Sequence, residues 1–295
     1  MVNPFQQFKA RLLLIGFLAI ALTLGIFLGV LEGLGLLPIG SDDPLLIPLV
    51  YILIFGSLCL LVIWQGRRLK VRFRYLIGTR PKRFSWLSGV MLTVVLLVFS
   101  LGMFQVSYYL LSFVQPELVE LTLQESPAIF IPADTASPVL YEALMFLSIV
   151  VVAPVAEEFL FRGVLLHRWG TKWGLPTAVI VSSVLFGVLH PNPIGLSMFG
   201  LVMTLLYLHT RSLWAPIFCH ALNNFLTIGL EVWATQANRS NPIDTLAEFR
   251  ESWWMGLVFI VISAPWLIRF IRRTWRQTRE PLPYFDNAAS RSQSA

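Results

Sequence analysis

The chain has 295 residues, of which 56% are hydrophobic and 13% are charged, and its mean hydropathy is +0.72. Because a soluble domain carries about 25% charged residues, this composition argues against a soluble globular protein and predicts an all-α, polytopic membrane protein. The formal charge of +6 does not indicate nucleic-acid binding, since the basic residues fall between apolar runs. Cys59 and Cys219 lie inside apolar runs, so we predict neither a disulfide framework nor a cysteine-rich metal site.

Eight apolar runs along the chain are candidates for transmembrane helices. A helix needs about 20 apolar residues to cross a hydrocarbon core of about 30 Å, and the fifth and sixth runs are near the lower length limit. The first run is too long for the apolar part of a typical signal peptide, so we expect a retained helix. The runs are Leu12–Leu31, Pro44–Trp64, Trp86–Phe113, Val139–Leu166, Pro176–Leu189, Ile194–Leu208, Leu213–Leu230 and Trp253–Ile271.

The charges in the connections predict how the chain is oriented in the membrane. Basic residues gather in Arg67–Arg83, between the second and third runs, and in Arg269–Arg279, at the end of the eighth run and beyond it. Acidic residues follow the first and third runs instead. By the positive-inside rule, we expect both termini and the Arg67–Arg83 connection to be cytoplasmic. The expected location is the bacterial cytoplasmic membrane.

The runs suggest four parts of the chain. Residues 1–138 hold three transmembrane helices, and residues 139–230 form a core that contains the polar residues described below. Residues 231–279 comprise an outer loop and the last transmembrane helix. Residues 280–295 contain two prolines and a polar, low-hydrophobicity end, which predicts a disordered cytoplasmic tail.

Two adjacent glutamates and an arginine stand well inside the fourth apolar run: Glu157, Glu158 and Arg162. A charge within the hydrocarbon costs at least a few kcal/mol, so such a residue is by default a candidate for a functional site. Glu158 and Arg162 are four residues apart, which places them on one helix face and predicts an ion pair. Glu157 lies about 100° around the helix and lacks that partner. A purely structural cluster of three charges remains the alternative.

Two further pairs of polar or aromatic residues have helical spacing. Phe186 and His190 end the fifth run, and His220 and Asn224 lie in the seventh. Each pair is four residues apart and therefore shares a helix face. Counting 1.5 Å per residue from the expected helix ends places these residues and Glu157 within the hydrocarbon core. The sequence therefore predicts one polar cavity inside the membrane.

The other two histidines of the chain stand beside basic residues at the ends of apolar runs. His167 precedes Arg168 at the end of the fourth run, and His209 lies close to Arg211 after the sixth. Both are expected to be structural residues at the membrane interface.

These motifs, and their order along the chain, resemble those of one known family. Glu157-Glu158-Phe-Leu-Phe-Arg162 is similar to the EExxxR motif of the CAAX protease and bacteriocin-processing (CPBP) family, and the pairs 186/190 and 220/224 are similar to its FxxxH and HxxxN motifs. The resemblance covers about residues 143–229. Members of this family include glutamate-dependent intramembrane endopeptidases such as the eukaryotic Ras-converting enzyme.

The resemblance implies a role for each matching residue. Glu157 and His190 would activate the attacking water, and His220 and Asn224 would form the oxyanion hole, with Phe186 in support of His190. It also implies a metal-independent glutamic peptidase that needs no cofactor. The expected partners are a membrane-associated protein or peptide substrate and the lipid bilayer, with no nucleic acid.

Three other interpretations fit the same residues. Glu157, His190 and His220 could bind zinc, although the sequence contains no HExxH motif. Ser197 with His220 as its base would make a serine protease. A buried polar cluster could also serve a non-catalytic immunity or scaffold protein. Peptidase activity that is lost in Glu157→Gln but survives chelation would separate these interpretations.

Overall fold

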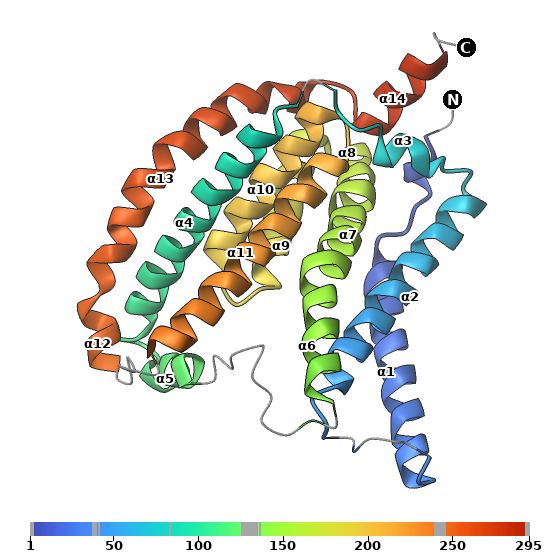
Figure 1. The fold of residues 1–295 in the computed structure, drawn as a ribbon. Helices are drawn as coiled ribbons and strands as arrows, with labels where there is room; N and C mark the ends of the chain where they lie inside the picture. Colours follow the sequence, from blue (N-terminus) through green and yellow to red (C-terminus); the bar gives the residue numbers. More distant parts are fainter. Residues whose placement is uncertain are drawn as a thin grey trace.

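The computed structural model describes residues 3–36, 40, 42–82, 84–124, 135, 137–238 and 246–292, and these contain helices but no β-strand (Figure 1). This confirms the prediction of an all-α membrane protein. The elements are η1 (Pro4–Gln6), α1 (Arg11–Gly33), α2 (Leu46–Arg68), α3 (Phe73–Ile77), α4 (Trp86–Leu111), α5 (Pro116–Gln124), α6 (Pro138–Leu147), η2 (Ser148–Val152), α7 (Ala153–Glu158), η3 (Phe159–Leu165), α8 (Leu166–Trp173), α9 (Leu175–Val188), α10 (Pro193–Thr210), α11 (Trp214–Asn238), α12 (Leu246–Glu251), α13 (Trp253–Thr274), η4 (Trp275–Arg279) and α14 (Pro283–Ser292).

The predicted number of about eight transmembrane helices is not confirmed. Within the described residues, six helical segments are long and apolar enough to cross a membrane. Of the other two predicted spans, α9 has 14 residues and so measures only about 21 Å. The other, α11, carries His220, Asn223 and Asn224, which lower its hydropathy. The six segments are Arg11–Gly33, Leu46–Arg68, Trp86–Leu111, Pro138–Trp173, Pro193–Thr210 and Leu246–Arg279.

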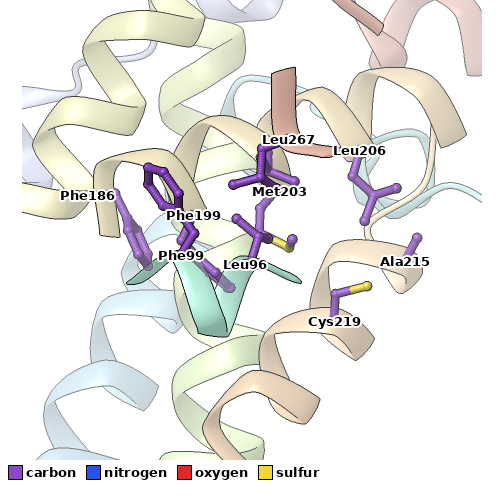
Figure 2. Packing of buried hydrophobic residues seen from close by; sticks show 10 residues of the cluster. Leu96, Phe99, Phe186, Phe199, Met203, Leu206, Ala215, Cys219 and Leu267 are labelled. Atoms are coloured by element: carbon purple, nitrogen blue, oxygen red, sulfur yellow. The ribbon is translucent and has the colours of Figure 1, made fainter. Parts of the chain in front are cut away.

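The main apolar core lies where α4, α9, α10, α11 and α13 meet. Figure 2 shows its side chains, which come from all five helices and interdigitate around Met203 on α10. Phe186 belongs to this core and is fully buried. Burial of a large aromatic side chain contributes a few kcal/mol, so the core fixes the end of α9 that precedes His190.

The fourth predicted span is a single long helix, Pro138–Trp173, that contains two π-helical turns. The first, η2, precedes α7, and the second, η3, follows it. In η2 the N–H of Ala153 bonds to the carbonyl of Ser148, five residues earlier. The next residue is Pro154, which has no N–H to continue this register. The carbonyl of Ile149 is therefore left without a donor from its own helix.

Helices α9 and α10 form a closely packed hairpin whose turn contains His190. The side chain of Asn192 accepts a hydrogen bond from the N–H of Gly195 and caps α10. A Cβ atom at Gly200 would lie 3.0 Å from the backbone of Ser183, so the glycine favours this close approach of the two helices. In Figure 1 the turn lies partway along α4 and α13. The hairpin thus delivers His190 to the interior of the helix bundle rather than to its end.

The C-terminal segment is helical, and the expectation of a disordered tail is wrong for residues 283–292. Helix α14 packs on α3, and Tyr284 and Ala288 are buried there. The side chain of Asn287 donates hydrogen bonds to the carbonyls of Tyr75 and Arg211, at 2.9 Å each. The polar composition of this segment suggested disorder, but these contacts join it to the rest of the protein.

His167 is fully buried, so it is not the interfacial residue that the sequence suggested. Its Nδ1 lies 3.1 Å from the carbonyl of Arg162, and its Nε2 accepts a hydrogen bond from the N–H of Tyr284 at 3.3 Å. His167 lies at the end of an apolar run in the sequence. In the structure it is buried, because the C-terminal segment covers this end of α8. His209, in contrast, is exposed, as expected.

Both termini and α3 lie at one end of the molecule, and α5 and α12 lie at the other (Figure 1). This arrangement is compatible with a common side for the termini and the Arg67–Arg83 connection, and the cytoplasmic side remains a prediction. In a protein with Cys59 and Cys219 replaced by alanine, we expect single cysteines at Arg74 and Glu120 to react with an impermeant maleimide from opposite sides. Labelling of both from the same side of intact cells would contradict the topology.

Candidate active site

Glu157 lies at the centre of the polar residues predicted from the sequence. Its Oε2 atom lies 3.9 Å from Nε2 of His190 and 3.9 Å from Nε2 of His220. This Oε2 atom is buried and has no hydrogen-bonding partner among the described residues. The His190 side chain is 28% exposed, whereas those of Glu157 and His220 are 11% and 5% exposed. The structure thus brings one carboxylate and two imidazoles together and leaves access from the side of His190.

Glu158 faces away from this point and connects two other residues. Its Oε1 atom accepts a hydrogen bond from Arg162 at 2.9 Å and lies 2.9 Å from Nδ1 of His220. The predicted contact between Glu158 and Arg162 is therefore present, and both side chains are almost completely buried. The sequence did not indicate the second contact, which ties His220 to the same carboxylate oxygen.

The guanidinium of Arg162 has several partners besides Glu158. It donates to the hydroxyl of Thr204 at 3.3 Å and to the carbonyl of Gly200 at 3.0 Å, both on α10. It also lies over the ring of Phe186, 4.8 Å from the centroid. A buried cation with this many partners orients its carboxylate firmly, because guanidinium donors are fixed in a plane. Arg162 is thus a link between the helix of the two glutamates and the α9–α10 hairpin.

Phe186 limits the movement of His190. The two rings stack with centroids 4.6 Å apart, and Nδ1 of His190 lies 2.6 Å from the carbonyl of Phe186. A carbonyl oxygen only accepts hydrogen bonds, so Nδ1 carries the hydrogen in this contact. In the neutral ring Nε2 is then the basic nitrogen, and it is the nitrogen that faces Glu157.

Asn224 contacts the unpaired carbonyl left by the first π-helical turn. Its Nδ2 donates to the carbonyl of Ile149 at 2.8 Å. The missing N–H of Pro154 thus explains why a side chain from α11 can bind here. A primary amide has two N–H groups, so one remains for another acceptor. π-Helical turns are frequent at functional sites, and this one positions a hydrogen-bond donor.

Comparison with known proteins shows a family match for the segment that carries these residues. The family profile described as type II CAAX prenyl endopeptidase Rce1-like matches residues 139–226. A protein of Bacillus subtilis (strain 168) named "Putative membrane peptidase YdiL" is 29% identical over 92 residues, which cover 30% of this chain and 38% of that protein. No solved structure matches the chain. This segment of the chain matches the CAAX protease family.

The matched CAAX protease segment includes all seven residues singled out in the sequence. It runs from the start of α6 into α11 and so contains the three motifs and both π-helical turns. It excludes α1, α2, α4 and α13, although α4 and α13 supply part of the core against which the segment packs. The chain spans about two fifths of the length of YdiL. The seven residues are Glu157, Glu158, Arg162, Phe186, His190, His220 and Asn224.

Tyr51 contributes to the site from outside the CAAX protease segment, and sequence reasoning did not identify it. It lies on α2, and its hydroxyl donates to Oε1 of Glu157 at 3.3 Å. Its ring stacks on Phe55 with centroids 4.4 Å apart. Because Tyr51 holds one oxygen of Glu157, the other oxygen faces the two histidines. A single tyrosine in an apolar run carries no signal that would have distinguished it beforehand.

The geometry also bears on the other interpretations of these residues. Among the described residues no group of three or more His, Cys, Asp or Glu side chains is placed to hold a metal ion. Two ligands of one tetrahedral zinc ion, with bonds of about 2.0–2.2 Å, lie about 3.4 Å apart. The separations around Glu157 are 3.9 Å, and chelation is the experiment that tests for a metal. Ser197 packs against Gly187 in the hairpin, and the described contacts include no hydrogen bond from it to His220.

Proposed function

We propose that the protein is an intramembrane endopeptidase that hydrolyses a peptide bond of a membrane-associated protein or peptide. The observation that carries this proposal is the buried Oε2 of Glu157, which lies at equal distance from the Nε2 atoms of two histidines. The match of this segment to the CAAX protease family supports the same chemistry. Because that match covers only part of the chain, the activity, the substrate and the metal-independent mechanism are all part of the proposal.

In this mechanism Glu157 and His190 activate the water. Glu157 accepts a proton as the water oxygen attacks the carbonyl carbon of the scissile bond, and Nε2 of His190 holds the water by a second hydrogen bond. The peptide C–N bond then breaks, and the proton passes to the leaving amine. A positioned general base typically contributes a factor of about 10²–10⁴ to the rate.

His220 and Asn224 would stabilise the oxyanion of the tetrahedral intermediate. The Oε1 atom of Glu158 accepts a hydrogen bond from Arg162, and because a carboxylate oxygen only accepts, Nδ1 of His220 donates to the same atom. Nε2 of His220 can then act as a donor only when the ring is doubly protonated. The doubly protonated ring makes Glu157, Glu158, Arg162 and His220 electrically neutral together, which suits a buried cluster.

The proposed function is tested by reconstituting the full chain in proteoliposomes with membrane-anchored peptides and detecting new N-termini by mass spectrometry. We expect cleavage that continues in the presence of a zinc chelator. Loss of cleavage on chelation, with recovery on addition of zinc, would assign these residues to a metal site. Absence of cleavage across a broad peptide set would favour the non-catalytic immunity or scaffold role.

Replacing Asn224 by alanine should lower kcat by a factor of about 10²–10³ with little change in KM, because one oxyanion donor is removed. Thr227→Ala is the matched control, since Thr227 lies one turn further along α11, is exposed, and bonds only to the carbonyl of Asn223. Michaelis–Menten kinetics on the same peptide give both constants. An increase in KM with unchanged kcat would show that Asn224 binds substrate rather than the transition state.

A further inference from the structure

A groove of about 900 Å³ lies between α4, α10 and α13, at the end of the molecule that carries the termini. We name it the α4–α13 groove. None of the seven motif residues lines it. Its walls are mainly apolar, and its mouth is basic. The apolar walls include Met91, Leu92, Val95, Trp266 and Phe270, and the mouth includes Lys82, Arg269 and Arg273.

Helices α4 and α13 pack closely at a pair of glycines beyond the inner end of the groove. A Cβ atom at Gly102 would lie 2.7 Å from the carbonyl oxygen of Gly256, so the two backbones are in contact there. Further along α13 stands Pro265, which interrupts the hydrogen bonding of the helix, and α13 curves across the outside of α4 (Figure 1). The space between the helices is therefore closed at the glycine pair and open at the basic end.

The cations at the mouth are available to an anion. Arg269 and Arg273 are four residues apart on α13 and thus share a face, and Lys82 approaches from the connection before α4. All three side chains are exposed, and in the described part of the chain no carboxylate forms an ion pair with any of them. The acidic residues nearby on the C-terminal segment, Glu280 and Asp286, pair with Arg211 instead.

We propose that the α4–α13 groove binds one anionic phospholipid. Its phosphate would lie against the three cations, and one acyl chain would lie along the apolar walls toward the glycine pair. A basic pocket between transmembrane helices is a recognised site for anionic headgroups. Trp266, which is 67% exposed on the outer face of the groove, gives the acyl chain an aromatic surface to pack on. A zwitterionic lipid has no net charge for the unpaired cations to attract, so the site discriminates by headgroup.

Native mass spectrometry of the detergent-solubilised full chain tests this proposal, with phosphatidylglycerol and phosphatidylcholine of equal chain length as probes. We expect phosphatidylglycerol alone to remain bound. The triple variant Lys82→Gln, Arg269→Gln, Arg273→Gln should bind it about 100-fold more weakly, since each cation near an anionic surface contributes a factor of about 5. The control variant Lys9→Gln, Arg67→Gln, Arg68→Gln removes the same charge from exposed positions outside the groove and should bind as the wild type does.

Two further measurements separate a lipid from other sources of phosphate. Ser88→Trp should fill the groove without altering its charge, because Ser88 is exposed and lines it, and should also reduce lipid binding. Inorganic phosphate in excess should not displace the lipid. Four results would each overturn the proposal. They are equal binding of both lipids, an equal loss of lipid binding in the control triple variant, unchanged lipid binding by the Ser88→Trp protein, and displacement of the lipid by phosphate.

Discussion

Glu157→Gln is expected to abolish peptide-bond hydrolysis while leaving the fold and substrate binding intact. The amide has the size of the carboxylate and can still accept from Tyr51, but it cannot take a proton from water. The measurement is single-turnover cleavage of a membrane-anchored peptide in proteoliposomes, together with the binding of the uncleaved peptide. Because the change removes the general base itself, we expect it to have the largest effect of any single substitution on turnover.

Glu142→Gln is the matched control for this experiment. Glu142 lies on α6, the first part of the same long helix, and is exposed away from the site. The identical chemical change there should leave the cleavage rate unchanged. A purified Glu157→Gln protein that cleaves at the rate of the control would refute the role of Glu157 as base.

The second large effect concerns stability, through the buried pair of Glu158 and Arg162. Either alanine substitution leaves an uncompensated charge in a site where the side chains are 0% and 1% exposed, which typically costs about 3–5 kcal/mol. We therefore expect a lower free energy of unfolding for each single variant, and a double variant that loses less than their sum. Unfolding in mixed micelles measures all three.

The partly exposed pair of Arg211 and Glu280 provides the comparison. The coupling between those two residues should be about 1 kcal/mol or less, because water screens it. Strict additivity at Glu158 and Arg162 would mean that the two side chains act independently. Because Glu158 also binds His220, we expect the Glu158 variant to lose activity even where it still folds.

The sequence was most informative where polar residues interrupt apolar runs. A charge in hydrocarbon needs a partner, so helical spacing was sufficient to predict the pairing of Glu158 with Arg162, and shared depth was sufficient to bring His190 and His220 toward Glu157. These inferences depend only on the geometry of a single helix or on the free-energy cost of burying a charge. They do not require knowledge of how the helices pack.

Features that depend on packing could not be predicted in the same way. The contact of Tyr51 with Glu157 joins residues 106 positions apart, and nothing local distinguishes that tyrosine. The helical C-terminal segment owes its order to α3 and to His167. The predicted count of about eight spans is not confirmed, because among the described residues α9 is an apolar helix of only 14 residues.

The two π-helical turns around α7 have a consequence for how this helix can change during evolution. Each π-helical turn accommodates more residues than an α-helical turn, and one residue corresponds to a rotation of about 100°. Deleting a single residue from Ser148–Val152 would restore a regular helix but would rotate α6 relative to Glu157 and remove the unpaired carbonyl that Asn224 binds. Lipid-facing positions on this helix can therefore accept substitutions among apolar residues, whereas the insertion or deletion of even one residue would disrupt the site.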